Sequence, residues 1–288
     1  MFFQRKCLLT FLLYFIIFGF GCKQKNNISP QGYDFTRPAK MEFGKELVEI
    51  SGIAYNSDNK TLLGISDNKE HIFQIDYKTP KLSDYTEKVV PPNSDLEDIV
   101  KLNDAVYIMA SKGLLYEIPN GVKDTSGVKV YDLGLSGTND FESLYYDSSL
   151  NGLVLLCKSC APDKGEPLRS AFKFDLATKT FSTSAIYYIS TDSVKTILKD
   201  NDAKFDPSAA AIHPINKFLY ILSSAGNLLV ITDTKGKVLD AYNLHPDQFP
   251  QAEGIAFAPD GTMFIANEGK FGTATLHVFP YKNVQTKK

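Results

Sequence analysis

The sequence predicts an all-β protein, a five-bladed β-propeller, on two observations. A short phrase recurs five times: an apolar residue or Pro, then Ser or Glu, then a mostly small residue, then an apolar strand. The copies begin at Ile50, Leu96, Phe141, Pro207 and Ala252. Their Ser or Glu positions are 46, 45, 66 and 45 residues apart, and a period near 45 in a strand-rich chain is typical of propeller blades.

The chain begins with a segment that does not belong to the propeller. Arg5 and Lys6 precede the apolar run Leu8–Phe20, which is too short to span a membrane and fits a secretory signal. The run ends at Gly21-Cys22, which predicts a bacterial lipoprotein signal over residues 1–21, with Cys22 as the lipidated first residue of the mature chain. Ordinary cleavage with an incidental cysteine is the alternative. Residues 22–35 are polar and predict a lipid-anchored flexible tether.

The first blade follows from apolar runs of five or six residues bounded by turn residues. We expect its strands at Ile50–Tyr55, Thr61–Ser66, His71–Asp76 and Tyr85–Val90. Such runs suit strands that are buried on both faces, as the inner strands of packed blades are.

The interval of 66 residues does not hide a sixth blade. It contains an extended turn, Lys158–Arg169, and a helical segment, Asp192–Leu198, which Thr191 can cap. Only the third and fourth strands of the same blade lie between them.

The last repeat ends after three strands, expected at Ile255–Ala258, Met263–Ala266 and Thr275–Phe279. Propellers usually close by borrowing a strand from the other terminus, which removes an exposed sheet edge. The alternating segment Ala39–Phe43 is placed to supply it. The propeller is therefore expected over residues 36–282, followed by a polar tail, 283–288.

Cysteine usage and charge limit the possible functions. Cys157 and Cys160 form a C-x-x-C at a strand end; a local disulfide or two thiols is favoured over a redox pair or half a zinc site. The chain has 31 basic and 33 acidic side chains, so nothing in its charge suggests the basic face that a nucleic-acid partner needs. No nucleophile elbow or phosphate-binding loop is visible, and the four histidines are scattered.

Acidic and amide residues are expected to gather at one mouth of the propeller channel. Glu97, Glu142 and Glu253 begin three inner strands, and Asp95 and Asp140 stand two residues before the first two of them. The hairpins between second and third strands share this face, and they contribute Ser111-Lys112, Lys158-Ser159, Ser224 and Asn267-Glu268.

Carboxylates around a narrow channel repel one another unless they are protonated, hydrated or bound to a cation. A hard cation with oxygen ligands is one solution, and the predicted metal ligands are Glu97, Glu142, Glu253, Asn267 and Glu268. The alternative is structural: the glutamates bond to backbone N–H groups of neighbouring blades and hold the ring closed.

Several phrases resemble the SdiA-regulated family: Leu96–Ile99, Phe141–Tyr146, Gln251–Ala256, and Leu62–Asp67 followed by Ile72–Asp76. The resemblance covers roughly residues 45–281. It implies a bacterial envelope protein with a five-bladed propeller, distantly NHL-like, that binds calcium and has no established activity. The chain departs from the family at Ser111-Lys112 and Ser224-Ala225, where relatives tend to carry acidic hairpins.

We therefore expect a lipid-anchored propeller outside the cytoplasm, in the cell envelope, at the outer membrane or the cell membrane. Its expected role is non-catalytic binding or scaffolding, with a calcium-type cation at the channel mouth and an envelope protein or small molecule as partner. The alternative is a calcium-dependent hydrolase of a phosphoester or lactone that uses the same face. That alternative requires His245 or Asp247 within reach of the metal.

Overall fold

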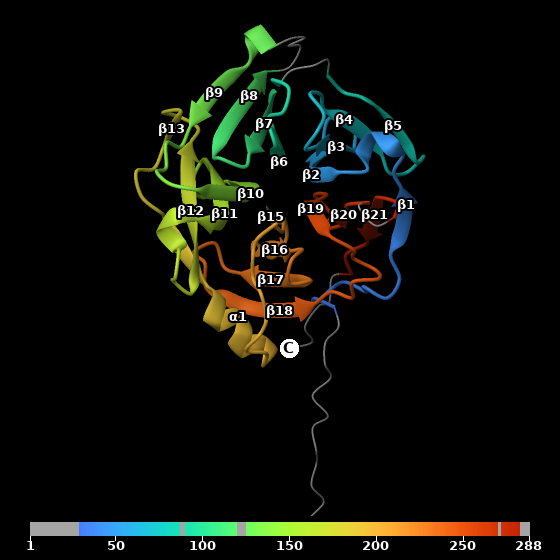
Figure 1. Cartoon of the computed structure of the whole chain (residues 1–288). Helices are drawn as coiled ribbons and strands as arrows, with labels where there is room; N and C mark the ends of the chain where they lie inside the picture. The colour runs from blue at the N-terminus through green and yellow to red at the C-terminus, as the bar shows by residue number, and fades with distance from the viewer. Residues whose placement is uncertain (1–28, 87–89, 120–124, 270–271, 283–288) are drawn as a thin grey trace, which may run out of the picture.

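The computed structural model describes residues 29–86, 90–119, 125–269 and 272–282, and these form five small sheets arranged in a ring (Figure 1). The predicted signal segment, Cys22 and the polar tail lie outside the described residues. Among the residues that are described, no helix is long and apolar enough to cross a membrane.

The five sheets follow one another along the chain, and each begins at the channel and runs outward (Figure 1). Blade 1 comprises β2 (Ile50–Asn56), β3 (Thr61–Ser66), β4 (Phe73–Asp76) and β5 (Lys81–Asp84). Blade 2 comprises β6 (Leu96–Leu102), β7 (Ala105–Ala110), β8 (Leu114–Pro119) and β9 (Lys129–Asp132). Blade 3 comprises β10 (Asn139–Asp147), β11 (Gly152–Cys160), β12 (Leu168–Asp175), β13 (Thr180–Phe181) and β14 (Tyr187–Ser190).

The remaining blades complete the circle. Blade 4 comprises β15 (Ala209–Ile212), β16 (Leu219–Ser223), β17 (Leu228–Thr232) and β18 (Val238–Asn243). Blade 5 comprises β19 (Ala252–Phe257), β20 (Met263–Asn267), β21 (Thr275–Phe279) and the N-terminal strand β1 (Ala39–Glu42). Outside the sheets lie α1 (Thr191–Leu198) and three 3-10 turns, η1 (Lys45–Leu47), η2 (Thr125–Gly127) and η3 (Ala161–Asp163).

The predicted closure of the ring is confirmed. Strand β1 pairs antiparallel with β21, in a register that sets Ala39 opposite Val278 and Glu42 opposite Thr275. The first strand of the described chain thus covers the outer edge of the last blade, which would otherwise expose unpaired backbone groups.

Three local details differ from the sequence-based expectation. The outer strand of blade 1 is β5, earlier than the expected 85–90, because a short turn after Asp76 returns the chain at once. Helix α1 is capped by Ser190, whose hydroxyl accepts from the Ser193 N–H, so Thr191 is its first residue. Strand β11 continues to Cys160, which shortens the expected turn, and the outer position of blade 3 is shared by β13 and β14.

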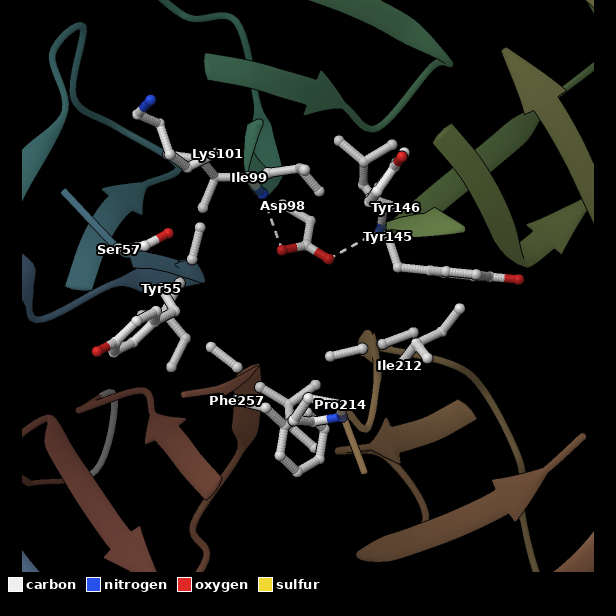
Figure 2. A pocket seen from close by; sticks show the side chains of 18 of the residues that line it. Tyr55, Ser57, Asp98, Ile99, Lys101, Tyr145, Tyr146, Ile212, Pro214 and Phe257 are labelled. Atoms are coloured by element: carbon white, nitrogen blue, oxygen red, sulfur yellow. Dashed lines mark hydrogen bonds between the residues drawn. The ribbon is translucent and has the colours of Figure 1, made fainter. Parts of the chain in front are cut away.

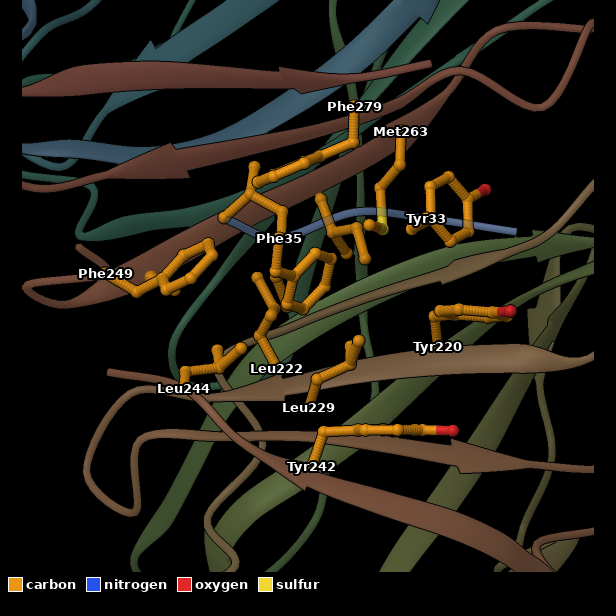
Figure 3. Close-up of a cluster of buried hydrophobic side chains, with 14 of the residues drawn as sticks. Tyr33, Phe35, Tyr220, Leu222, Leu229, Tyr242, Leu244, Phe249, Met263 and Phe279 are labelled. Atoms are coloured by element: carbon orange, nitrogen blue, oxygen red, sulfur yellow. The ribbon is translucent and has the colours of Figure 1, made fainter. Parts of the chain in front are cut away.

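Hydrophobic clusters fill the spaces between neighbouring blades. The cluster between blades 4 and 5 includes two residues from the segment before β1, Tyr33 and Phe35 (Figure 3). Phe35 packs against Phe249 and Phe279 at ring-centroid distances of 5.5 and 4.8 Å. The expected tether therefore extends too far: the packed chain already includes Tyr33 and Phe35.

Candidate functional site at the acidic mouth

β-Bulges present the recurring polar residue at the start of four inner strands. In β2, β6, β10 and β19, the pairing with the next strand skips one residue, and the skipped residues are Ser51, Glu97, Glu142 and Glu253. A bulge leaves its extra residue unpaired and re-aims its side chain. The repeat in the sequence is therefore a repeat of bulges, and it holds three glutamates at equivalent places around the channel.

Two of the glutamates meet an aspartate from the start of β10. Glu97, Asp140 and Glu142 each offer one carboxylate oxygen, and these three oxygens lie within 4.8 Å of one another. All three side chains are half-buried. We call the group formed by Asp95, Glu97, Asp140, Glu142 and Glu253 the acidic mouth.

A lysine stands inside this acidic group. Lys158 of β11 donates to the Glu142 carboxylate, and its Nζ lies 3.6 Å from Asp140 Oδ2. These carboxylates raise the pKa of Lys158, against the effect of its burial. The lysine therefore carries one positive charge among five acidic groups and cannot neutralise them all.

The three glutamates of the acidic mouth have raised pKa values. Burial, with the nearby charges of Glu142, Asp95 and Asp140, raises the pKa of Glu97 to about 9. Burial also raises the pKa of Glu142 to about 7, although the bond from Lys158 opposes the rise. Burial and the Glu142 charge raise the pKa of Glu253 to about 8, against a hydrogen bond from Ser224. The charges of Glu142 and Lys158 also act on Glu253, which links blade 5 to the same electrostatic cluster.

The other two predicted ligands lie on the last hairpin. Asn267 at the end of β20 is fully buried; its amide donates to Thr275 Oγ1 at 3.2 Å, and its Oδ1 has no hydrogen-bond partner. The charge of Glu268 acts on Glu253. The structure thus brings Glu97 and Glu142 together directly and couples Glu253 and Glu268 to them electrostatically. It turns Asn267 toward β21.

Blade 4 uses its serine for structure. Ser208 Oγ donates to Ala252 O at 2.8 Å and accepts from Ser224 N at 3.2 Å. The bond to Ala252 ties blade 4 to the first residue of β19. The structural role that we considered for the recurring polar residue is therefore present in blade 4, while the acidic members lie in blades 2, 3 and 5.

Three contributors lie outside the predicted ligand set. The sequence indicates Asp95 and Asp140 only as neighbours of Glu97 and Glu142, and Lys158 only as a hairpin residue. Asp140 could have been found by the same period, because Asp95 precedes Glu97 by the same two residues. The sequence places Lys158 on this face, but its contact with Glu142 could not have been found, because that contact depends on the extension of β11 and on a register that skips Lys158 between Ser159 and Cys157.

The remaining candidate residues are His245, Asp247 and the two cysteines. His245 and Asp247 pair with each other at 3.6 Å, and their side chains are 70% and 92% exposed. Neither is among the main causes of the pKa shifts of the three glutamates. Cys157 and Cys160 are joined by a disulfide on either side of Lys158-Ser159, as the favoured reading of the C-x-x-C predicted.

The fold and the acidic mouth define a five-bladed β-propeller with a carboxylate cluster at one end of its channel. The sequence profile of the SdiA-regulated family matches residues 25–271. The chain therefore belongs to the SdiA-regulated family, as its resemblance implied.

Solved structures with a similar fold are distant in sequence. A luciferin-regenerating enzyme is 12% identical, with a TM-score of 0.52, over 86% of this chain and 96% of its own. A gluconolactonase from Xanthomonas campestris is 13% identical, with a TM-score of 0.47, over 81% and 72%. A virginiamycin B lyase from Staphylococcus aureus is 11% identical, with a TM-score of 0.45, over 81% and 68%. At these identities the likeness concerns the fold alone. No curated protein sequence matches this chain.

Proposed function

We propose that the protein is a lipid-anchored, extracytoplasmic binding or scaffolding module whose acidic mouth holds a calcium ion. The observation that carries the proposal is the convergence of one oxygen each from Glu97, Asp140 and Glu142 within 4.8 Å. Calcium binds oxygen ligands at about 2.3–2.6 Å, so two ligands on opposite sides of the ion are about 4.6–5.2 Å apart. The three oxygens fit within that span.

The charge balance supports the same assignment. Five acidic groups face one lysine, and the pKa values of three glutamates rise because Lys158 and Ser224 offset only part of their burial and repulsion. A divalent cation would neutralise the carboxylates in place of the bound protons. Glu97, Asp140 and Glu142 are the residues that would hold it, with Glu253 and Glu268 contributing charge from blade 5.

Membrane anchoring rests on the sequence alone. The apolar run that ends at Gly21-Cys22 motivates it, and replacement of Cys22 by Ser tests it: the protein should move from the membrane fraction to the soluble envelope fraction. One acyl chain binds only marginally, so durable attachment implies several chains.

A binding role is favoured over hydrolysis by the position of the candidate proton-transfer groups. A calcium-dependent hydrolase needs an acid or base within hydrogen-bond reach of the metal-bound reactants. His245 and Asp247, the two candidates, pair with each other in an exposed loop.

Calcium titration monitored by thermal unfolding tests the metal proposal. Adding calcium should raise the Tm of the unmutated protein, since a ligand that binds only the folded state stabilises it by mass action. Glu142→Gln removes one ligand and should abolish the rise. Glu166→Gln, an exposed glutamate of the same blade, is the matched control and should keep it.

The four melting curves, unmutated and Glu142→Gln with and without calcium, separate the metal role from the structural one. If Glu142 only braces the ring, its replacement changes the Tm equally with and without calcium. The absence of any calcium-dependent shift in the unmutated protein contradicts the proposal outright.

A further inference from the structure

The channel contains a second compartment beyond the acidic mouth, a cavity of about 350 Å³ (Figure 2). Each of the five inner strands lines it with three or four consecutive residues that follow the recurring polar position. The cavity is thus built by the repeat itself, and its size lies within the range of small-molecule sites.

The wall of this cavity is mainly apolar. Isoleucines and alanines of β2, β6, β15 and β19 form much of it, and Tyr55, Phe257 and Pro214 also line it (Figure 2). The half-buried rings of Tyr55 and Phe257 offer flat apolar surface to a ligand. Such a wall favours a ligand with a small apolar body.

One carboxyl group lies at the inner end. Asp98 is 2% exposed, and its two oxygens accept bonds from Ile99 N and Leu144 N, both at 2.8 Å (Figure 2). Asp98 follows Glu97 directly, so adjacent acidic residues serve the two compartments. A carboxylate has about four acceptor positions, so each oxygen of Asp98 retains capacity for a donor from within the cavity.

No cation of the described chain neutralises Asp98. The only basic residue that lines the cavity, Lys101, directs its ammonium to Asn103 O and lies 3.4 Å from Asp58 Oδ2. A buried carboxyl with two backbone donors and no counter-charge is a place where a cationic ligand gains most.

The neighbouring blade makes room for this side chain. A Cβ added at Gly52 would lie 2.8 Å from both Asp98 Cα and Asp98 Oδ1. Gly52 therefore leaves room for Asp98. The other four phrases have only small residues, Gly, Ser or Ala, at the position of Asp98.

We propose that this cavity binds a small apolar molecule with one primary amine, whose ammonium pairs with Asp98 and whose apolar body lies among the isoleucine and alanine side chains. The three supporting observations are the volume, the apolar wall and the single uncompensated carboxyl. The site is independent of a metal at the acidic mouth.

Isothermal titration calorimetry with three probes of similar size tests the charge preference. Benzylamine should bind at least about tenfold more tightly than benzoate, with benzyl alcohol between them, since a charge-assisted bond is worth at least that much. Equal affinities for benzylamine and benzoate overturn the proposal, as does a lack of binding by every probe.

Variants locate the site. Asp98→Asn should weaken benzylamine binding about tenfold or more while benzyl alcohol binding changes little. Ala211→Leu, which adds bulk at a half-buried position in the wall, should abolish binding of both, and Ala177→Leu in an exposed turn is its control. If Asp98→Asn does not fold, judged by near-ultraviolet circular dichroism, the probe preference and Ala211→Leu still decide.

The acidic mouth is the competing site for an amine. Glu142→Gln should leave benzylamine affinity unchanged, because Glu142 does not line the cavity. Loss of benzylamine binding in Glu142→Gln, or its retention in Ala211→Leu, overturns the assignment to this cavity.

Discussion

Glu97 and Glu142 occupy the same position of the repeat but differ in pKa. Both are bulged and half-buried at the same mouth. Glu142 receives a bond from Lys158, and its pKa rises only to about 7. Glu97 is surrounded mainly by acidic charges, and its pKa rises to about 9. Burial is the largest cause of both rises, and the direct bond from Lys158 keeps the pKa of Glu142 below that of Glu97.

Glu97→Gln should therefore stabilise the calcium-free protein at alkaline pH. The unfolded chain loses this proton near pH 4.5 and the folded protein near pH 9, so the stability that the protonated group contributes is lost as pH rises between these values. Glutamine mimics the protonated form and escapes this loss. The expected gain in the free energy of unfolding near pH 9 is on the order of 1 kcal/mol or more, with little difference near pH 5.

Urea unfolding at a series of pH values measures this difference, and Glu166→Gln is again the control. Saturating calcium should reverse the sign, because the variant then lacks a ligand that the unmutated protein uses. A variant that is less stable than the unmutated protein at every pH without calcium contradicts the raised pKa of Glu97.

At the scale of the element, the bulge and its facing hairpin form the unit that builds the site. The period of the phrase was enough to predict the inner strands and the convergence of Glu97 and Glu142, because position in a repeat fixes position around an axis. The period could not predict that Lys158 contacts Glu142 and Asp140. Its place depends on how far β11 extends beside the bulged start of β10, and the expected turn began at that residue.

The hairpin residue Lys158 is expected to compete with calcium. Its ammonium already contacts Glu142 and Asp140, two of the proposed ligands. Lys158→Met keeps the length of the side chain and removes the charge, so calcium affinity should rise several-fold, where tenfold corresponds to about 1.4 kcal/mol. Lys112→Met, at the corresponding hairpin of blade 2, should change it little. Calorimetric titration with calcium measures both, and unchanged or weaker binding by Lys158→Met would contradict this role.

The disulfide belongs to the same unit. Cys157 and Cys160 flank Lys158-Ser159, and both sulfur atoms lie 3.8 Å from the carbonyl oxygen of Asp140. The disulfide therefore closes a loop within β11 that contains the lysine, and this loop packs against the strand that carries Asp140. The sequence favoured a structural role for this C-x-x-C because a buried strand precedes it, and the bonded pair agrees with that expectation.

At the scale of the whole molecule, closure depends on chain that precedes the first repeat. Strand β1 was predictable because the last repeat lacked a fourth strand and an alternating segment was available. The earlier segment was not, because its composition is polar and only two aromatic residues, Tyr33 and Phe35, carry the packing. Tyr33 donates from its hydroxyl to Gly261 O at 2.6 Å, and its ring meets His213 and Tyr220 (Figure 3).

Phe35→Ala tests whether this N-terminal segment belongs to the folding unit. Phe35 is 4% exposed and lies between β21 and the loop that leads into β19, where it contacts Phe279 and Phe249. Truncation of a buried phenylalanine usually costs about 3–5 kcal/mol, through lost transfer free energy and the cavity left behind. Thr36→Ala, at the exposed neighbouring position, should stay within about 0.5 kcal/mol. Because Phe35 packs in the cluster between blades 4 and 5, unfolding should remain a single transition in both variants, monitored by circular dichroism and by calorimetry. A loss below about 1 kcal/mol for Phe35→Ala would mean that the ring closes through β1 alone, with the preceding residues as the tether that their composition suggests.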